Sequence, residues 1–241
     1  ENNPIINSLS KSYKYSYNKR LLQRLKKYSK IKLIGMGGSS LGAKSIYSFL
    51  RKNIKKEFIF YDNLSYRKQS HENSKNTLNL IISKSGNTLE TITNTNISAI
   101  KSQKNVFITE NKNSYLLNLA KKLKSEVVFH NNYIGGRYSV LSEVGMLPAE
   151  LMGLKESQFK KYDNLIKNKK FLNALISSVS NILNYSKKGK TNSIILNYDE
   201  NSSDLFYWYQ QLVAESLGKK GKGFLPIISN LPKDNHSLMQ L

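Results

Sequence analysis

The sequence predicts an α/β fold in which a parallel sheet is flanked by helices on both faces. Two observations carry this prediction. Short apolar runs recur along residues 30–130, and segments with a helical spacing of apolar side chains separate them. Strands and helices that alternate in this way form parallel sheets covered on both sides. Because such crossovers are right-handed, the loops that follow the strands should meet at one edge of the sheet, its carboxyl edge.

The elements of this first sheet can be placed in order along the chain. A short basic helix over 19–28 should come first. Helices are then expected where apolar side chains recur every three or four residues, over 40–50, over 88–100 and through the leucines of 116–123. The expected strands are the short apolar runs over 31–34, 58–61, 78–82, 106–108 and 127–129.

The second part of the chain begins as a helical region and ends as a new alternating unit. After a loop over 131–142, the pattern is helical to about residue 185. A strand over 194–196, a helix over 204–217 and a strand over 224–228 follow. We therefore expect three parts: a lead-in over 1–29, a first domain over 30–152, and linking helices with an incomplete second domain over 153–241.

The chain is strongly basic, but its charge is spread along the sequence. The formal net charge is +22, from 38 Lys and Arg against 16 Asp and Glu, which favours polyanionic partners or small acidic substrates. Only five of the basic residues are Arg, and the composition is also rich in Asn, Ile, Ser and Tyr, as A/T-rich codons would give. A nucleic-acid-binding surface needs clustered basic and aromatic residues, so we rank that class last.

The chain contains no cysteine, which excludes disulfide bonds and thiolate metal sites. This composition fits a reducing compartment, and the cytoplasm is the expected location. No segment has the apolar length needed to cross a bilayer, and the first residues show no signal-peptide pattern. We expect neither a membrane nor a nucleic acid among the partners.

Two loops that follow strands could hold a ligand. Residues 35–42 (GMGGSSLG) lie between a strand and a helix, where glycines allow close approach and free N–H groups face a ligand. The spacing does not fit the dinucleotide fingerprint, and a plain tight turn explains it equally well. Residues 83–88 (SKSGNT) supply three hydroxyls, a cation and a glycine at a helix start, which suits a phosphate monoester. A turn capped by Asn87 and Glu90 is the alternative.

Three further features contain candidate catalytic groups. Residues 135–139 (GGRYS) hold an Arg, whose permanent charge and rigid fork Lys cannot supply. Gln211 and Glu215 lie four residues apart on one predicted helix, so they share a face that also carries apolar residues. A desolvated Glu215 would have a raised pKa, as a general base requires, although an exposed helical Glu is commoner. His236 follows a strand, whereas His71 and His130 are interpreted as structural.

These five features resemble, in order and kind, the signature loops of the glucose-6-phosphate isomerase family. The resemblance covers about residues 30–241, and five motifs in order make it specific. It implies sugar-isomerase-type domains of three layers, each a parallel sheet flanked by helices. It also implies a homodimer, and an enzyme of glycolysis and gluconeogenesis that interconverts glucose 6-phosphate and fructose 6-phosphate through an enediolate.

The resemblance also implies roles for particular residues. Glu215 would be the general base, Arg137 would stabilise the enediolate with Gln211 beside it, and His236 would assist ring opening from the partner subunit. The phosphate would be held by Ser83, Lys84, Ser85 and Thr88, and the sugar by Gly38 and Ser39. The family also uses a Lys near its C-terminus, which we expect to lie beyond Leu241, and a longer N-terminal region.

Proton transfer next to a carbonyl needs a base and a charge stabiliser, and no metal or redox cofactor. No cofactor is therefore expected. A non-catalytic sugar-phosphate-binding module of the same fold stays open as the alternative, although such a module would need the phosphate loop and not the base.

Overall fold

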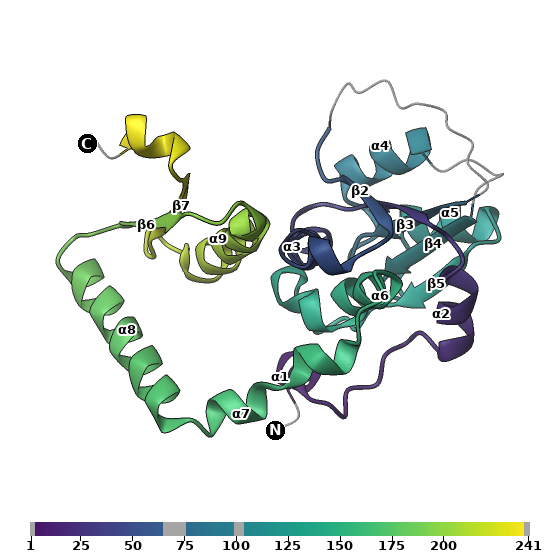
Figure 1. Cartoon of the computed structure of the whole chain (residues 1–241). Helices are drawn as coiled ribbons and strands as arrows, with labels where there is room; N and C mark the ends of the chain where they lie inside the picture. The colour runs from purple at the N-terminus through teal and green to yellow at the C-terminus, as the bar shows by residue number, and fades with distance from the viewer. Residues whose placement is uncertain (1–2, 65–75, 99–103, 239–241) are drawn as a thin grey trace.

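The computed structural model describes residues 3–64, 76–98 and 104–238. Its centre is a five-stranded, all-parallel sheet in the order β2-β1-β3-β4-β5, which confirms the predicted α/β fold (Figure 1). All six residues of β3, at the centre of the sheet, are buried, as a strand covered on both faces requires. The strands are β1 (Lys30–Ile34), β2 (Glu57–Tyr61), β3 (Thr77–Ile82), β4 (Lys104–Thr109) and β5 (Glu126–Phe129).

Helices cover both faces of this sheet, because its strands are apolar on both sides. On one face, α2 (Lys19–Leu25), α3 (Leu41–Phe49) and α6 (Glu143–Leu151) enclose a large core that includes Ile31 and Leu33 of β1. On the other face, α4 (Leu89–Ser98) and α5 (Tyr115–Lys122) cover a smaller core. Each fully buried Leu or Ile contributes about 1.5–3 kcal/mol relative to its exposed state. The predicted three layers are therefore present in the first part of the chain.

The observed elements differ from the predicted ones mainly at their ends and in the N-terminal lead-in. A six-residue helix, α1 (Pro4–Leu9), precedes α2, and the sequence pattern did not predict it. Asn3 caps α1 by accepting a hydrogen bond from the N–H of Ile5, and Pro4 opens it. The predicted loop over 131–142 contains a short 3₁₀ helix, η3 (Gly136–Leu141). The expected end of α4 near residue 100 and the loop with His71 lie outside the described residues.

The second part of the chain forms the predicted strand–helix–strand unit. Strands β6 and β7 pair in parallel, and α9 connects them (Figure 1). Helix α9 packs against α3 of the first part, so the two parts of the chain meet there. The elements are η4 (Glu156–Lys160), α7 (Tyr162–Ile166), α8 (Lys169–Lys187), β6 (Asn192–Asn197), η5 (Glu200–Ser202), α9 (Ser203–Leu217), β7 (Leu225–Asn230) and η6 (Lys233–His236).

This unit leaves much apolar surface open to solvent. Helix α8 has no buried residue and runs along the outside of the molecule (Figure 1). Its Ile176 is 62% exposed, and Ile194 of β6 is 52% exposed. A parallel sheet normally has both faces covered, so within the described residues this second sheet is only partly covered. No helix of the described part is long and apolar enough to cross a membrane.

Candidate active site

Three of the motif-bearing loops lie at the carboxyl edge of the five-stranded sheet, as predicted. Residues 35–40 follow β1 and include a 3₁₀ turn, η1 (Gly37–Ser39). Residues 83–88 follow β3, the neighbour of β1, and residues 130–141 follow β5. The ends of β1 and β3 are so close that a Cβ at Gly35 would lie 2.9 Å from the carbonyl oxygen of Ile82. This edge is where open α/β sheets bind their ligands.

The glycines of the first and third loops allow two backbones to touch. A Cβ at Gly38 would lie 2.3 Å from the carbonyl carbon and oxygen of Gly136, so no larger residue fits without moving the backbone. Ser139 Oγ donates to the carbonyl oxygens of Gly136 and Gly38, at 2.7 and 3.3 Å. The sequence predicts that the glycines of 35–42 allow a ligand to approach the backbone closely. The structure adds that Gly38 and Gly136 set the position of the loop that carries Arg137.

The loop over 83–88 is an ordered turn rich in hydroxyl groups. Gly86 has a φ of +67°, which favours glycine. Ser83 Oγ lies 3.0 Å from Thr88 Oγ1, and it also accepts from the N–H of Gly86 at 3.2 Å. The expected capping pair of Asn87 with Glu90 is not among the hydrogen bonds of the described residues. Asn87 Oδ1 instead accepts from the N–H of Tyr115, at the start of α5, because that helix lies beside the turn.

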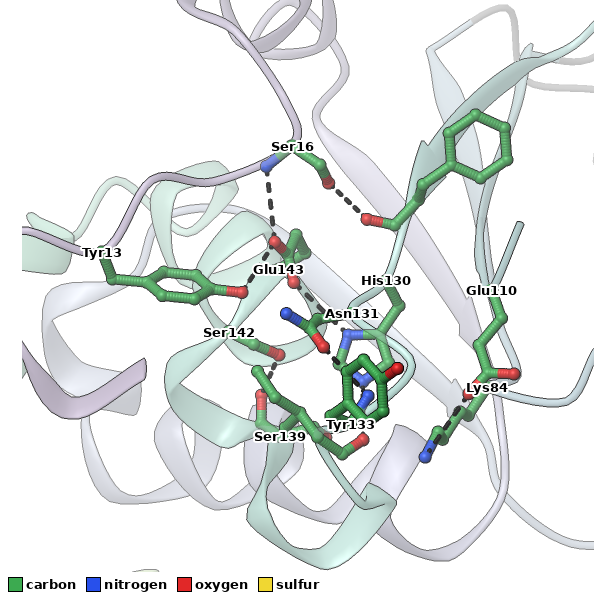
Figure 2. Close-up of polar contacts among 12 residues, drawn as sticks. Tyr13, Ser16, Lys84, Glu110, His130, Asn131, Tyr133, Ser139, Ser142 and Glu143 are labelled. Carbon is green, nitrogen blue, oxygen red and sulfur yellow. Dashed lines mark hydrogen bonds and ion pairs between the residues drawn. The ribbon is translucent and has the colours of Figure 1, made fainter. Parts of the chain in front are cut away.

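Lys84 projects from this turn and meets a carboxylate that the sequence analysis missed. Its Nζ lies 3.4 Å from Glu110 Oε1 (Figure 2), and Lys112 Nζ lies 3.1 Å from the other carboxylate oxygen. The Glu110 side chain is only 8% exposed. It directly follows β4 and so belongs to the same edge of the sheet, which is the signal that could have revealed it. Two ammonium groups beside one carboxylate leave a net positive charge for an anion.

Glu215 meets Arg137 at this edge, although the two residues lie 78 positions apart. Arg137 Nη1 donates to Glu215 Oε1 at 2.8 Å, and Arg137 Nε donates to Ser216 Oγ at 2.9 Å. The guanidinium also lies over the ring of Tyr138, 4.6 Å from its centroid, and the Tyr138 hydroxyl lies 2.9 Å from Ser216 Oγ. The hydrogen bond to Ser216 lowers the pKa of Tyr138. Arg137 is therefore held on three sides.

Of the two environments that the sequence left open for Glu215, desolvated or exposed, the structure shows the exposed one. The Glu215 side chain is 50% exposed, because its part of α9 faces a polar loop and solvent. Its nearest charged partner is the guanidinium of Arg137. An ionised carboxylate is the form in which Glu accepts a proton.

Gln211 lies one turn before Glu215 and reaches the first loop. A Cβ at Gly37 would lie 2.8 Å from Gln211 Nε2, so the amide lies against the glycine turn. Gln211 Oε1 is buried, and it has no hydrogen-bond partner among the residues that the structure describes. A buried acceptor without a donor costs about 1–3 kcal/mol, so it is suited to a ligand hydroxyl or a water.

Helix α9 is anchored to the first part of the chain by side chains that the sequence analysis did not single out. Ser45 Oγ of α3 donates to the carbonyl oxygen of Asp204 at 2.8 Å, and Ser48 Oγ donates to its carboxylate. Trp208 Nε1 donates to the carbonyl oxygen of Arg137 at 3.4 Å. These contacts bring the face with Gln211 and Glu215 over the glycine loops.

His236 is not brought to this site by its own chain. It lies exposed on η6, beyond β7 and farther from the five-stranded sheet than α9 is (Figure 1, yellow). Within the described residues, no hydrogen bond joins it to Glu215 or Arg137. In the part of the chain that the structure describes, there is no group of three His, Cys, Asp or Glu side chains that could hold a metal ion.

The carboxyl edge of this three-layer α/β sheet thus carries the serine-rich turn and the glycine loops, and the third of these loops carries Arg137, which pairs with Glu215 of α9. The chain belongs to the phosphoglucose isomerase family, whose model matches residues 22–223. This finding confirms the resemblance inferred from the five motifs.

Individual relatives agree with this membership. The chain is 34% identical, over 94% of its length, to the glucose-6-phosphate isomerase of Methanocaldococcus jannaschii, and 33% identical, over 92%, to that of Acholeplasma laidlawii. It spans 60% and 58% of those two proteins. Among solved structures, a hypothetical protein from Thermus thermophilus superposes with a TM-score of 0.75 at 24% identity, covering 92% of this chain and 59% of that one, which supports the fold.

Proposed function

We propose that the protein is an aldose–ketose isomerase that interconverts glucose 6-phosphate and fructose 6-phosphate, with Glu215 as the general base. The observation that carries the proposal is the contact of Glu215 with Arg137 at the ligand-binding edge of the sheet. In the aldose-to-ketose direction, Glu215 takes the proton from C2, which leaves an enediolate with its negative charge on O1. The proton then returns to C1 while O1 gains a proton and O2 loses its proton.

The electrostatics of the site support this division of roles. Burial opposes the charge of Arg137, but hydrogen bonding with Tyr138 and the charge of Glu215 raise its pKa, so it stays cationic. A fixed cation beside the base stabilises the negative charge that develops on the enediolate oxygens. A non-catalytic binding module would need the phosphate turn and not this pair, so the pair favours the isomerase.

The other assignments follow from the place of each residue. We propose that Ser83, Lys84, Ser85 and Thr88 hold the phosphate, and that Gly38, Ser39 and Gln211 line the sugar. We also propose a cytoplasmic homodimer in which His236 assists ring opening in the partner's site, since His236 lies exposed and apart from its own Glu215. The division of the chain near residue 152, where α6 has ended, belongs to the same proposal.

Hydrogen exchange into the substrate tests the reaction directly. We expect the full-length protein, with chelator present, to convert fructose 6-phosphate in D₂O into glucose 6-phosphate that carries deuterium at C2, as ¹H NMR would detect. The deuterium enters because a carboxylic acid exchanges its proton with solvent while the enediolate is bound. Conversion in neither direction would contradict the proposed function, and conversion without any solvent deuterium would contradict a solvent-exchanging base.

A separate prediction concerns Lys84. The phosphate does not react, so it is held similarly in the ground state and the transition state. We expect Lys84→Ala to raise KM for fructose 6-phosphate by roughly tenfold or more while kcat changes less. Lys121→Ala, on the exposed face of α5, is the matched control and should change neither constant. A collapse of kcat at constant KM would place Lys84 in the chemistry instead.

A further inference from the structure

A buried His–Glu pair lies next to the loop that carries Arg137, and the proposed reaction does not use it. His130 directly follows β5, and Glu143 opens α6. Their side chains are 1% and 3% exposed, and His130 Nδ1 lies 3.3 Å from Glu143 Oε2 (Figure 2). Burying two ionisable groups is costly unless they are paired and hydrogen-bonded, so the rest of their contacts is informative.

On one side, the pair is joined to the N-terminal segment, defined here as residues 12–17. Glu143 Oε1 accepts from the hydroxyl of Tyr13 at 2.9 Å and from the N–H of Ser16 at 3.3 Å. Ser16 Oγ donates to the carbonyl oxygen of Phe129, at the end of β5 (Figure 2). Burial alone would raise the pKa of Glu143, but the hydrogen bonds with His130 and Tyr13 hold it below its usual value.

The N-terminal segment is held down at a second point by a buried cation. Lys160 Nζ, in η4, lies 4.6 Å from the ring centroid of Tyr13 and 4.5 Å from that of Tyr15. The side chain of Lys160 is buried, and burial lowers its pKa to about 8. Residues 12–17 are therefore docked on β5 and α6 by hydrogen bonds and on η4 by cation–π contacts.

On its other side, the pair is joined to the arginine loop. His130 Nε2 lies 3.0 Å from the carbonyl oxygen of Ile134 (Figure 2). A carboxylate oxygen and a carbonyl oxygen thus face the two ring nitrogens, and a ring nitrogen that bears a proton donates to the acceptor beside it. Ile134 is fully buried and comes three residues before Arg137. Since Gly136 touches Gly38, the loop is held between His130 and the glycine turn.

We propose that Tyr13, Glu143 and His130 are positioning residues that couple the docked N-terminal segment to the loop carrying Arg137. The inference rests on the role proposed above for Arg137. Arg137 must keep its guanidinium within 2.8 Å of Glu215, and the backbone before it is tied to His130. Loss of the network frees Ile134 and the glycines that follow it, and small displacements of a catalytic group are costly to rate.

The same segment supplies a matched control. The hydroxyl of Tyr17 donates to Glu150 Oε2 at 2.7 Å, which is also a Tyr–Glu hydrogen bond between the N-terminal segment and α6. Tyr17 and Glu150 make no hydrogen bond to the arginine loop within the described residues. Tyr13→Phe and Tyr17→Phe each remove one hydroxyl from the same segment, but only Tyr13→Phe interrupts the connection to His130.

The experiment compares Tyr13→Phe, Glu143→Gln and Tyr17→Phe in the full-length protein. Hydrogen–deuterium exchange of peptides covering 131–142 is expected to be at least about threefold faster in Tyr13→Phe and Glu143→Gln than in the wild type. The hydrogen bond from the N–H of Tyr138 to the carbonyl of Gly135 lies in these peptides. Steady-state kinetics should show kcat lowered roughly tenfold with KM little changed, because Arg137 acts in the transition state. Tyr17→Phe should leave both readouts as in the wild type.

Unchanged exchange of 131–142 in both Tyr13→Phe and Glu143→Gln would overturn the coupling. Equal acceleration in Tyr17→Phe would also overturn it, since a general loss of stability would then explain the result. Faster exchange with unaltered kcat would overturn the positioning role. Because the exchange measurement needs no turnover, it decides the coupling even if the wild type failed to isomerise the sugar phosphates, a result that would contradict only the proposed function.

Discussion

Glu215→Gln should lower kcat for the conversion of fructose 6-phosphate to glucose 6-phosphate by about a hundredfold or more. A neutral amide cannot take the proton from carbon, and a general base contributes roughly 10²–10⁴-fold to rate. Gln keeps the size of the side chain and an oxygen that can accept from Arg137, so the loss reports the missing base and not a displaced arginine. KM should change far less than kcat, as coupled-enzyme kinetics would measure.

Glu200→Gln is the matched control for this variant. Glu200 is an exposed carboxylate in η5, just before α9, so the same loss of charge occurs near the same helix without touching Arg137. It should retain kcat within about twofold, since exposed substitutions away from a site have small effects. Full activity of Glu215→Gln would remove Glu215 from the mechanism.

Arg137→Lys should lower kcat by on the order of 10²–10³-fold, although the charge is kept. The guanidinium donates to Glu215 and Ser216 at once and lies flat on the ring of Tyr138. A lysine ammonium is a point charge on a flexible stem and cannot reproduce that fork. The cation would then be less well placed for the enediolate, which exists only along the reaction path, so kcat should fall more than KM rises.

Arg51→Lys tests whether any arginine on an aromatic ring behaves in this way. Arg51 lies over the ring of Tyr47, 5.1 Å from its centroid, and donates to the carbonyl oxygen of Ile54 at 2.6 Å, but it lies after α3 and outside the site. The Arg51→Lys substitution should lower the stability of the fold somewhat and leave kcat unaltered. If Arg137→Lys kept kcat within about threefold, a point charge would suffice and the three-sided fixation of Arg137 would have no catalytic purpose.

Local sequence pattern determined the architecture of the first part of the chain and the position of its motifs. The strands and helices lie within a few residues of their predicted bounds, because the period of apolar residues depends only on neighbours in sequence. The rule that strand-to-helix loops share the carboxyl edge then placed residues 35–40 and 83–88 together. Helical periodicity likewise placed Gln211 and Glu215 on one face.

Tertiary structure decided which of these groups meet and in what environment. The contact of Glu215 with Arg137 depends on the docking of α9 on α3 through Ser45 and on the close approach of two glycine loops. No local sequence pattern predicts either contact. The bond of Ser45 to Asp204 and that of Ser139 to Gly38 each join residues about a hundred or more positions apart, and the glycines that approach each other have no side chain. The exposure of Glu215 follows from the same packing, which is why burial could not be predicted from the apolar residues beside it.

His130 shows the same distinction, because the sequence indicates a structural residue and the fold indicates a positioning residue. The sequence by itself determined that this residue follows an apolar strand, and nothing local marks it as more than structural. Only the fold brings Glu143 and Tyr13 to one side of its ring and the carbonyl of Ile134 to the other. A hydrogen-bond network is a property of distances in three dimensions, whereas periodicity records only which face of an element is apolar.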